Sequence, residues 1–413
     1  MKSIPRFIPS LTIGELFSVL KSKQKKTNNQ NELTVFAEQF AKYIGVSYAI
    51  PAPSGRAALA GLIEALGLPK EGEVILPSLT FHAIPLIFKE YGLKPHFVDI
   101  NPNTYCMDTN CLEKAINPST VAIMPVHLYG RACNMNVIVK IAKQYDLIVI
   151  EDCAQSCGGY HNKRRLGSFG QGAIFSFHPH KNFLCLESGM VVTNSKEVAV
   201  KLKSFMEQFS STNQFSLFKK LFYIVKMRAI TRAWVWNFFV GPILRFCSCL
   251  GFDPIELLTN ETPKENIGIK QGNLFMPGEL HGRIGISQLK KIDKLNQKCI
   301  DNGNRLWEKL QNISGIEVPE RALDGENVYM SFVIGVKNKK VFRHRLRYLG
   351  VDTHGGNMFV GPYLPGMEGK ELATVAFDKI KHMVHLPIYP TMTYEEIDRI
   401  AAAITKAVVD QRC

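Results

Sequence analysis

Short β-branched runs alternate with amphipathic stretches from about residue 45 to residue 195, and this alternation constrains the fold more than any other feature. It is typical of a sheet wound with crossover helices, because each helix carries the chain back to begin the next parallel strand. Helices are expected at 56–66 and 136–145, with Gly or Asp at their ends. Strands are expected at 73–77, 95–100, 121–126, 147–150, 173–177 and 190–193. The sequence therefore predicts an α/β fold with a mostly parallel sheet.

The 413 residues fit a large domain followed by a smaller one. Apolar residues recur at helical intervals over 280–311, which predicts a helical link between the two. Beyond it, a strand at 329–336 and a helix at 394–409 indicate a small α+β domain. We expect a large α/β/α domain at 1–290, interrupted by an insertion at about 210–270, and a small domain at 291–413.

The composition indicates a packed globular protein, with 46% hydrophobic and only 21% charged residues. Ten cysteines are scattered without a CxxC pair, and we interpret them as reduced thiols. Pro5 and Pro9 interrupt the first ten residues, which lack the continuous apolar run of a signal peptide. A cytoplasmic location is therefore expected.

The formal net charge of +14 is concentrated in one window. Residues 201–250 hold eight lysines and arginines but one acid, Glu207, so half of the excess charge is local. Such a balance raises nucleic acid, acidic substrates or an anionic membrane as partners. No nucleic-acid-binding motif is present, so nucleic acid is not expected.

Lys181 follows a strand with a buried pattern, in the run Phe175-Ser-Phe-His-Pro-His-Lys181. Burial would lower the pKa of this amine and leave more of it neutral and able to attack an aldehyde. A lone lysine in a loop is more often simply solvated. The prediction that Lys181 is reactive therefore depends on the residues around it.

Asp152 ends the apolar run Leu147-Ile-Val-Ile-Glu-Asp152, where catalytic groups of open α/β sheets commonly lie. A carboxylate there would hold the pyridine nitrogen of pyridoxal phosphate (PLP) protonated. The alternative is that Glu151 and Asp152 merely solvate the end of a strand.

Ser54-Gly-Arg56 opens a helix whose free N–H groups and dipole would bind a phosphate. Ser and Gly in this position more often only cap a helix.

Several motifs together carry a resemblance to a known family. They are Ser54-Gly-Arg-Ala-Ala-Leu59, Leu79-Thr-Phe-His-Ala83, Phe97-Val-Asp-Ile100, Pro125-Val-His-Leu-Tyr-Gly130, Ile150-Glu-Asp-Cys-Ala-Gln155, Ser176-Phe-His-Pro-His-Lys181-Asn, Glu279-Leu280 with Ile284-Gly-Ile-Ser-Gln-Leu289, and Leu386-Pro-Ile-Tyr-Pro390. From about Phe7 to Ala407, apart from the basic window, the chain resembles the DegT/DnrJ/EryC1/StrS aminotransferases. These are PLP enzymes of fold type I that aminate nucleotide-linked keto-sugars.

The resemblance implies a role for individual residues. Lys181 would hold the cofactor covalently and Asp152 would face its ring nitrogen. Gln155 would contact the ring hydroxyl, Phe81 would pack on the ring face, and Gly55, Arg56 and Ser176 would hold the phosphate. It also implies a homodimer with sites at the subunit interface, glutamate as amino donor and a keto-sugar nucleotide as acceptor.

The chain departs from the family pattern at three places. Arg56 stands where relatives usually have Thr, and His180 where Thr is common before the lysine. Leu274-Phe-Met-Pro-Gly278 replaces the usual Asn-Tyr-Arg-Met segment, and Asn273 would take the role of that Asn only with a one-residue slip. We therefore expect this chain to bind the cofactor phosphate with different residues than its relatives do, with Arg56 offering a bidentate contact.

The window 215–252 is longer than this part of the family usually is, and it combines basic groups with many aromatic residues. Such a mixture suits a peripheral contact with the inner face of a membrane. The alternative is a helical hairpin that packs on the enzyme itself or on its dimer partner. A membrane span is not expected, because Asn237, Pro242 and Arg245 interrupt the most apolar stretch.

Other chemistries find less support in the sequence. His178 and His180 lack a Cys or carboxylate at ligand spacing, so we expect stacking or hydrogen bonding near the cofactor and no metal. No GxGxxG or GxxxxGK[ST] loop is present.

Two rivals to the aminotransferase stay open. One is a dehydratase that uses pyridoxamine phosphate (PMP), against which Lys181 argues, and the other is a non-catalytic, membrane-associated protein on the same scaffold.

Overall fold

The computed structural model describes residues 3–21, 31–211, 214–255, 274–323, 325–356 and 358–409. Its centre is a seven-stranded sheet in the order β1-β10-β9-β6-β5-β2-β4. The strands are β1 (Tyr48–Ala52), β2 (Glu73–Pro77), β4 (Lys94–Val98), β5 (Thr120–Ile123), β6 (Ile148–Asp152), β9 (Gly172–Ser176) and β10 (Gly189–Thr193). From β9 to β4 neighbouring strands are parallel, while β10 and β1 add antiparallel pairs at one side. The expected mostly parallel sheet is confirmed.

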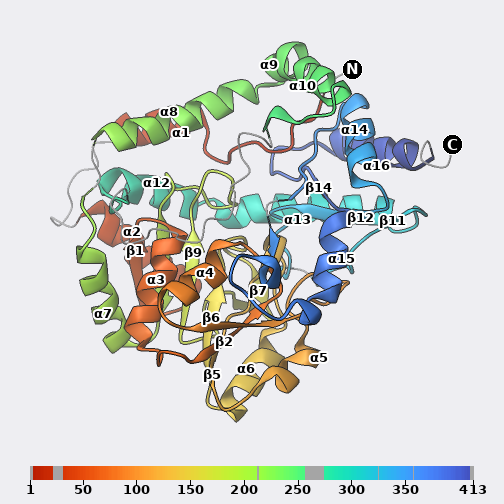
Figure 1. The fold of residues 1–413 in the computed structure, drawn as a ribbon. Helices are drawn as coiled ribbons and strands as arrows, with labels where there is room; N and C mark the ends of the chain where they lie inside the picture. Colours follow the sequence, from red (N-terminus) through yellow and green to blue (C-terminus); the bar gives the residue numbers. More distant parts are fainter. Residues whose placement is uncertain are drawn as a thin grey trace.

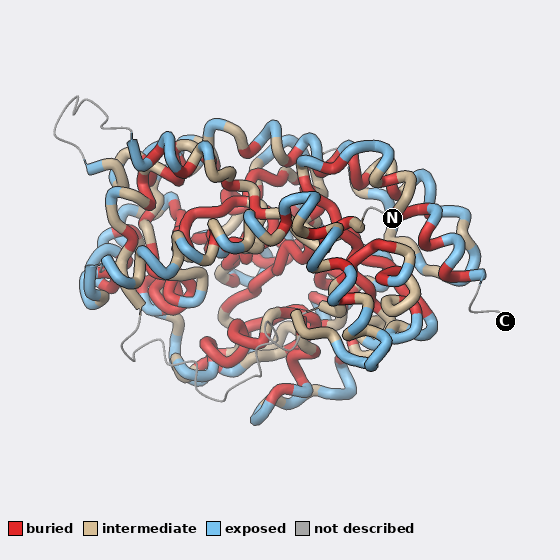
Figure 2. Tube along the Cα trace, turned by 90° about the horizontal axis from the view of Figure 1, so that it is seen from above, coloured by how far each residue is buried: buried red, intermediate tan, exposed pale blue. Residues whose placement is uncertain are grey.

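Helices enclose this sheet (Figure 1). Those of the first half are α1 (Ile13–Lys21), α2 (Glu32–Ile44), α3 (Gly55–Leu66), α4 (Ala83–Glu90), α5 (Thr109–Leu112), α6 (Met135–Gln144) and α7 (Lys196–Glu207). Figure 2 shows the buried strands at the centre and the exposed sides of the helices around them. The strands are buried on both faces because crossover helices cover a parallel sheet from both sides.

A second sheet of three strands lies in the C-terminal part. It has the order β11 (Ile316–Glu317), β12 (Phe332–Val336), β14 (Met383–Leu386) and has its own apolar cluster. The helices of this half are α12 (Glu279–Leu289), α13 (Ile292–Leu310), α14 (Lys339–Tyr348), α15 (Thr374–His382) and α16 (Tyr394–Val409). The stretch expected to be helical over 280–311 consists of two helices, α12 and α13. The division at residues 290 and 291 stays a prediction.

Four short strands lie outside the two larger sheets. They are β3 (Leu79–Thr80) paired with β13 (Phe359–Val360), and β7 (Tyr160–His161) paired with β8 (Arg164–Arg165). The first pair ties the segment before Phe81 to the C-terminal half of the chain.

The insertion folds into helices that lie along one side of the molecule (Figure 1). These are α8 (Gln214–Ile230), α9 (Ala233–Val235), a π-helical turn at Trp236–Val240 and α10 (Gly241–Cys249). Within the described ranges, no helix is both long enough and apolar enough to cross a lipid bilayer.

Candidate active site

The carboxyl ends of two adjacent strands bring Asp152 and the loop of Lys181 together. β6 and β9 pair in parallel, with Asp152 opposite Ile174. Asp152 is the last residue of β6, and Lys181 follows the end of β9 by five residues. Neighbouring parallel strands end at the same edge of a sheet, which is where open α/β sheets bind their ligands. The fold thus places the two predicted catalytic residues at one edge.

Asp152 and Lys181 influence each other electrostatically without direct contact. Burial raises the pKa of the Asp152 carboxyl, against the opposing effects of the Ala154 N–H, Lys181 and His127. Burial also lowers the pKa of Lys181, and the charge of Asp152 opposes this shift. Within the described part of the chain, Nζ of Lys181 makes neither a hydrogen bond nor an ion pair. Only Oδ1 of Asp152 has a hydrogen-bond donor, the Ala154 N–H at 2.8 Å.

Asp152 is buried and Lys181 is half-buried, and the two are not joined, so a group that bridges them would satisfy both. PLP fits this requirement, because its ring nitrogen is basic and its aldehyde condenses with an amine. The residues present therefore fit the cofactor that the sequence predicts.

The start of α3 forms a cradle suited to an anion. Ser54 caps the helix by accepting the Ala57 N–H at 3.2 Å. A Cβ atom at Gly55 would lie 2.9 Å from Cβ of Ser176, so only glycine allows this close approach. The N–H groups of Gly55 and Arg56 lie in the first turn, where a helix has no acceptor of its own. Gly55, Arg56 and Ser176 therefore lie together, as the phosphate site requires.

Gln155 and Phe81 lie at the same edge of the sheet. Gln155 is 4% exposed, and its Oε1 accepts the N–H of Tyr129 at 3.0 Å. Its Nε2 faces only Sδ of Met358 at 3.7 Å, a weak acceptor that leaves donor capacity for a ring oxygen. Phe81 follows β3, is half-buried and packs on the ring of His82 with 4.4 Å between centroids.

The sequence and the structure were compared with those of known proteins. The family model of the DegT/DnrJ/EryC1/StrS aminotransferases matches residues 10–234 and 262–405. The chain belongs to this family. Aminotransferases of this family depend on PLP, so the predicted enzyme class, fold type and cofactor are confirmed.

Individual members of the family resemble the chain over most of its length. The spore coat polysaccharide biosynthesis protein SpsC of Bacillus subtilis is 27% identical, over 90% of this chain and 88% of its own. The dTDP-3-amino-3,6-dideoxy-alpha-D-galactopyranose transaminase of Aneurinibacillus thermoaerophilus is 29% identical, over 91% and 90%. The crystal structure of NtdA from Bacillus subtilis with bound PMP superposes with a TM-score of 0.70 at 26% identity, over 99% of this chain and 86% of its own.

Tyr129 lies in the motif Pro125-Val-His-Leu-Tyr-Gly130 but was given no role from the sequence, and the structure shows that it contacts the predicted site residue Gln155. Its φ of +58° lies in the left-handed region, which bulky residues seldom adopt. The hydrogen bond from its N–H to Gln155 stabilises this conformation and orients the Gln155 amide. No local sequence signal indicated this contact, because the two residues are 26 positions apart.

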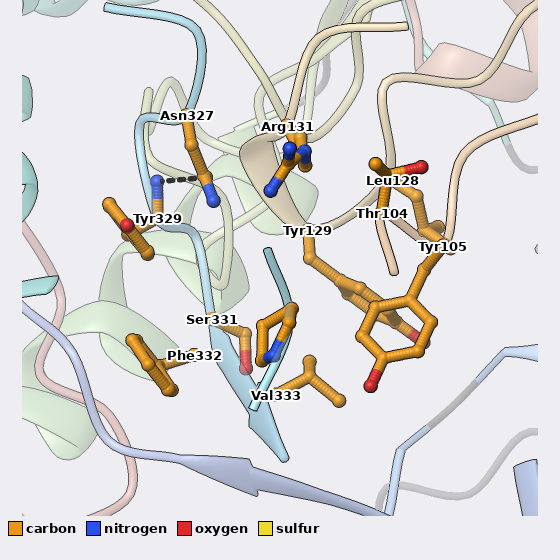
Figure 3. A pocket seen from close by; sticks show the side chains of 11 residues that line it. Thr104, Tyr105, Leu128, Tyr129, Arg131, Asn327, Tyr329, Ser331, Phe332 and Val333 are labelled. Atoms are coloured by element: carbon orange, nitrogen blue, oxygen red, sulfur yellow. Dashed lines mark hydrogen bonds between the residues drawn. The ribbon is translucent and has the colours of Figure 1, made fainter. Parts of the chain in front are cut away.

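Tyr129 and Arg131 also line a hollow on the other side of this segment (Figure 3). Tyr105 lies beside Tyr129, while Ser331 and Phe332 close the hollow from the start of β12. Arg131 is the one cation in this lining, and its guanidinium donates to the carbonyl of Glu320. The hollow contains none of the predicted site residues.

His178 and His180 stack on each other with 5.3 Å between ring centroids. Nε2 of His180 lies 3.1 Å from the hydroxyl of Tyr223, and the ring of Phe7 packs on His180 at 4.8 Å. Burial lowers the pKa of His180 to about 4, with further effects of Lys181 and Arg6, so the ring is neutral at neutral pH. The predicted stacking and hydrogen bonding are thus seen, and α8 of the insertion supplies one of the partners.

The structure describes part of the segment 273–278, where the sequence departs from the family pattern. Met276 bridges to Ser211 and donates its N–H to the carbonyl of Ser210 at 2.8 Å, next to the point where the insertion leaves α7. Asn273 lies outside the described residues.

Glu151 has a structural role that differs from that of its neighbour Asp152. Successive strand residues point to opposite faces, and Glu151 is completely buried. Its carboxylate accepts the N–H groups of Gly167, Phe169 and Gly170 at 2.7–2.9 Å. The proposal that both carboxylates merely solvate a strand end is therefore wrong for Glu151.

His127 completes the surroundings of Glu151. Its Nδ1 accepts the N–H of Cys133 at 3.1 Å, so Nε2 carries the proton and faces Glu151 at 3.4 Å. His127, Glu151 and Cys153 are close enough to resemble a metal site. The histidine lone pair is already used by the Cys133 N–H, however, so the group serves packing and not metal binding.

We expect Glu151→Ala to lower the free energy of unfolding by about 3–5 kcal/mol, because three buried N–H groups would lose their acceptor. Urea unfolding of the apoenzyme would measure the change. Glu371→Ala, at an exposed position, is the matched control. A loss below about 1 kcal/mol would contradict the assigned role.

Proposed function

We propose that this enzyme moves an amino group from glutamate to the keto group of a nucleotide-linked sugar. The observation that carries the proposal is the placement of the buried Asp152 and the half-buried Lys181 at the ligand edge of the sheet, close enough to influence each other but not joined. Relatives support the acceptor class, since their names include a dTDP-amino-sugar transaminase and a GDP-perosamine synthase.

Each predicted site residue has a task in this proposal. Lys181 holds the cofactor, Asp152 faces its ring nitrogen, and Gln155 donates to its ring oxygen. Gly55, Arg56 and Ser176 hold its phosphate, while Phe81 packs on the ring face. When bound, PLP supplies an electron sink for the carbon that loses or gains a proton.

Lys181 also moves that proton in the proposed reaction. Because burial lowers its pKa, a larger fraction of Nζ is neutral and able to accept a proton at neutral pH. The Ala154 N–H donates to Oδ1 of Asp152 and so favours the ionised carboxylate, against the effect of burial on its pKa. The neutral His180 adds no positive charge beside the lysine, and such a charge would lower the pKa of Nζ further.

We further propose that the enzyme is a homodimer and acts in the cytoplasm, including the inner face of the membrane. The dimer is supported by the resemblance to a family whose sites lie at subunit interfaces. By the family resemblance, segment 274–278 would correspond to the segment with which relatives reach the neighbouring cofactor, so its altered sequence would change contacts across that interface.

Incubation of the enzyme with PLP, glutamate and a panel of keto-sugar nucleotides tests the proposal. Mass spectrometry is expected to show a product in which an amino group replaces the keto oxygen, with 2-oxoglutarate formed in equal amount. A product that has lost a hydroxyl without gaining nitrogen would establish the dehydratase instead. Absence of turnover with every sugar would favour a non-catalytic protein.

A further inference from the structure

The outward faces of the insertion helices carry large apolar side chains. Ten of the 21 large hydrophobic residues that are exposed in the described part of the chain lie within 215–252. Their exposed fractions range from 42% to 76%. They are Phe215, Phe218, Phe222, Trp234, Phe238, Phe239, Ile243, Phe246, Leu250 and Phe252. A surface of this kind on a soluble enzyme marks an interaction site.

Helix periodicity places these residues on one side of each helix. On α8, Phe215, Phe218 and Phe222 recur at intervals of three and four residues and so share one face. The opposite face packs on the enzyme, where Ile224 is buried and Leu217 and Leu221 contact the core. Packing on the protein body therefore accounts for the inner face alone.

The same division holds for the helices that follow. Trp236 and Leu244 are buried, whereas Trp234, Phe238 and Phe246 point outward. All of these helices lie along the same side of the molecule (Figure 1).

Contacts at the end of the insertion fix the direction of this face. Ser248 of α10 lies 2.8 Å from Nδ1 of His344 on α14. Asp253 accepts from Arg6, Arg343 and Arg347 at 2.5–3.0 Å. These contacts hold the insertion helices against the enzyme, so the apolar residues lie on a fixed surface and not on a free loop.

Charge distinguishes between the partners that would cover this face. Residues 214–252 contain six lysines and arginines and no acid. Lys219 and Lys226 are exposed on the same side of α8 as the phenylalanines, and Nζ of Lys219 lies 4.3 Å from the ring centre of Phe215. A second copy would bring the same positive charge to the interface, whereas an anionic lipid surface would neutralise it.

We propose that α8, α9 and α10 dock on an anionic lipid surface. The aromatic side chains enter the headgroup region, and the lysines extend along them to the lipid phosphates. This proposal deepens the proposed location at the inner face of the membrane and is independent of the acceptor sugar.

Docking would hold the active site close to the lipid. Tyr223 on the inner side of α8 contacts His180, the residue before Lys181. An α-helix with its side chains is about 10–12 Å across. The cofactor lysine loop would therefore lie about one helix diameter beneath the membrane surface.

Vesicle sedimentation with the full-length holoenzyme tests the proposal. We expect binding to vesicles that contain phosphatidylglycerol and little binding to phosphatidylcholine alone, with a loss of binding at high salt. Fluorescence of Trp234 is expected to shift to shorter wavelength on binding, and the shift should be absent in Trp234→Phe.

Surface variants identify the groups responsible. Each basic residue near an anionic surface contributes about a 5-fold gain in binding, so Lys219→Glu with Lys226→Glu should weaken binding at least about 30-fold. Phe218→Ser with Phe222→Ser should weaken it by at least about 10-fold. The matched controls are Lys114→Glu with Lys143→Glu, and Leu323→Ser with Tyr394→Ser, at exposed positions outside the insertion.

The outcomes separate the docking proposal from the catalytic one. Transamination in solution should continue in the surface variants, which shows that they are folded. The docking proposal is overturned if the intact enzyme ignores anionic vesicles, or if the insertion variants bind as well as the controls. It is equally overturned if the phenylalanine variants change only the oligomeric state, because the face would then meet a second copy of the chain.

Discussion

Lys181→Ala is expected to lower the rate of amino transfer by about 10⁴-fold, at the upper end of what a proton-transferring group contributes. The variant loses the amine that would hold the cofactor and move the proton. It should bind PLP only reversibly and lack the visible absorbance of the covalently held cofactor. Steady-state rates with glutamate and the best acceptor, together with the absorption spectrum, measure both effects.

Two variants sharpen this test. Lys181→Arg keeps a positive charge, but a guanidinium stays protonated and does not attack the aldehyde, so it should be as inactive as the alanine variant. Lys196→Ala, at an exposed position at the start of α7, should behave as the parent enzyme. An alanine variant at 181 within about 10-fold of the parent rate would remove Lys181 from catalysis.

The lowered pKa of Lys181 adds a pH dependence to the same test. The amine reacts when it is neutral, so the rate at which apoenzyme takes up PLP should rise with pH. Because burial lowers the pKa, the midpoint of this rise should lie below the ordinary lysine value of about 10.4. A rise that followed the ordinary value would show that Lys181 is solvated.

The sheet was predictable wherever a strand is strongly apolar and buried on both faces. Predicted strands at 73–77 and 190–193 match β2 and β10 to within one residue. β1 was missed because Pro51 lies in it, and proline is a poor strand signal. The structure places β1 at the edge of the sheet, where a strand tolerates proline. The break between α12 and α13 was missed because apolar periodicity continues through Lys290 and Lys291.

The site could be predicted only in part, for a reason that lies in strand order. β6 and β9 are neighbours in the sheet, but the sequence pattern does not give the order of strands within a sheet, so local pattern alone does not show that Asp152 meets the Lys181 loop. The family resemblance supplied that pairing. Contacts such as Glu151 with Gly167, or Tyr223 with His180, join distant segments and lack any local signature.

Asp152→Asn is expected to lower the turnover rate by about 10²–10³-fold, as removal of a preorganised charged or polar group does in other active sites. Asparagine keeps the shape and can still accept the Ala154 N–H, so the loss would report the missing negative charge. Asp108→Asn, at the N-cap of α5 and outside the site, is the matched control. Turnover of the 152 variant within about 3-fold of the parent would contradict the role of the carboxylate.

The same substitution should make the apoenzyme more stable at neutral pH. Burial raises the pKa of Asp152, so the folded state holds its proton more tightly than the unfolded state. Below the ordinary value of about 3.9 the carboxyl is protonated in both states and costs nothing. As the pH rises through the raised pKa, the folded protein must ionise a buried group and loses stability. Urea unfolding of parent and Asp152→Asn apoenzymes should therefore diverge with rising pH, and PLP should stabilise the parent more. Equal stabilities across the pH range would show that the carboxylate is not strained in the absence of cofactor.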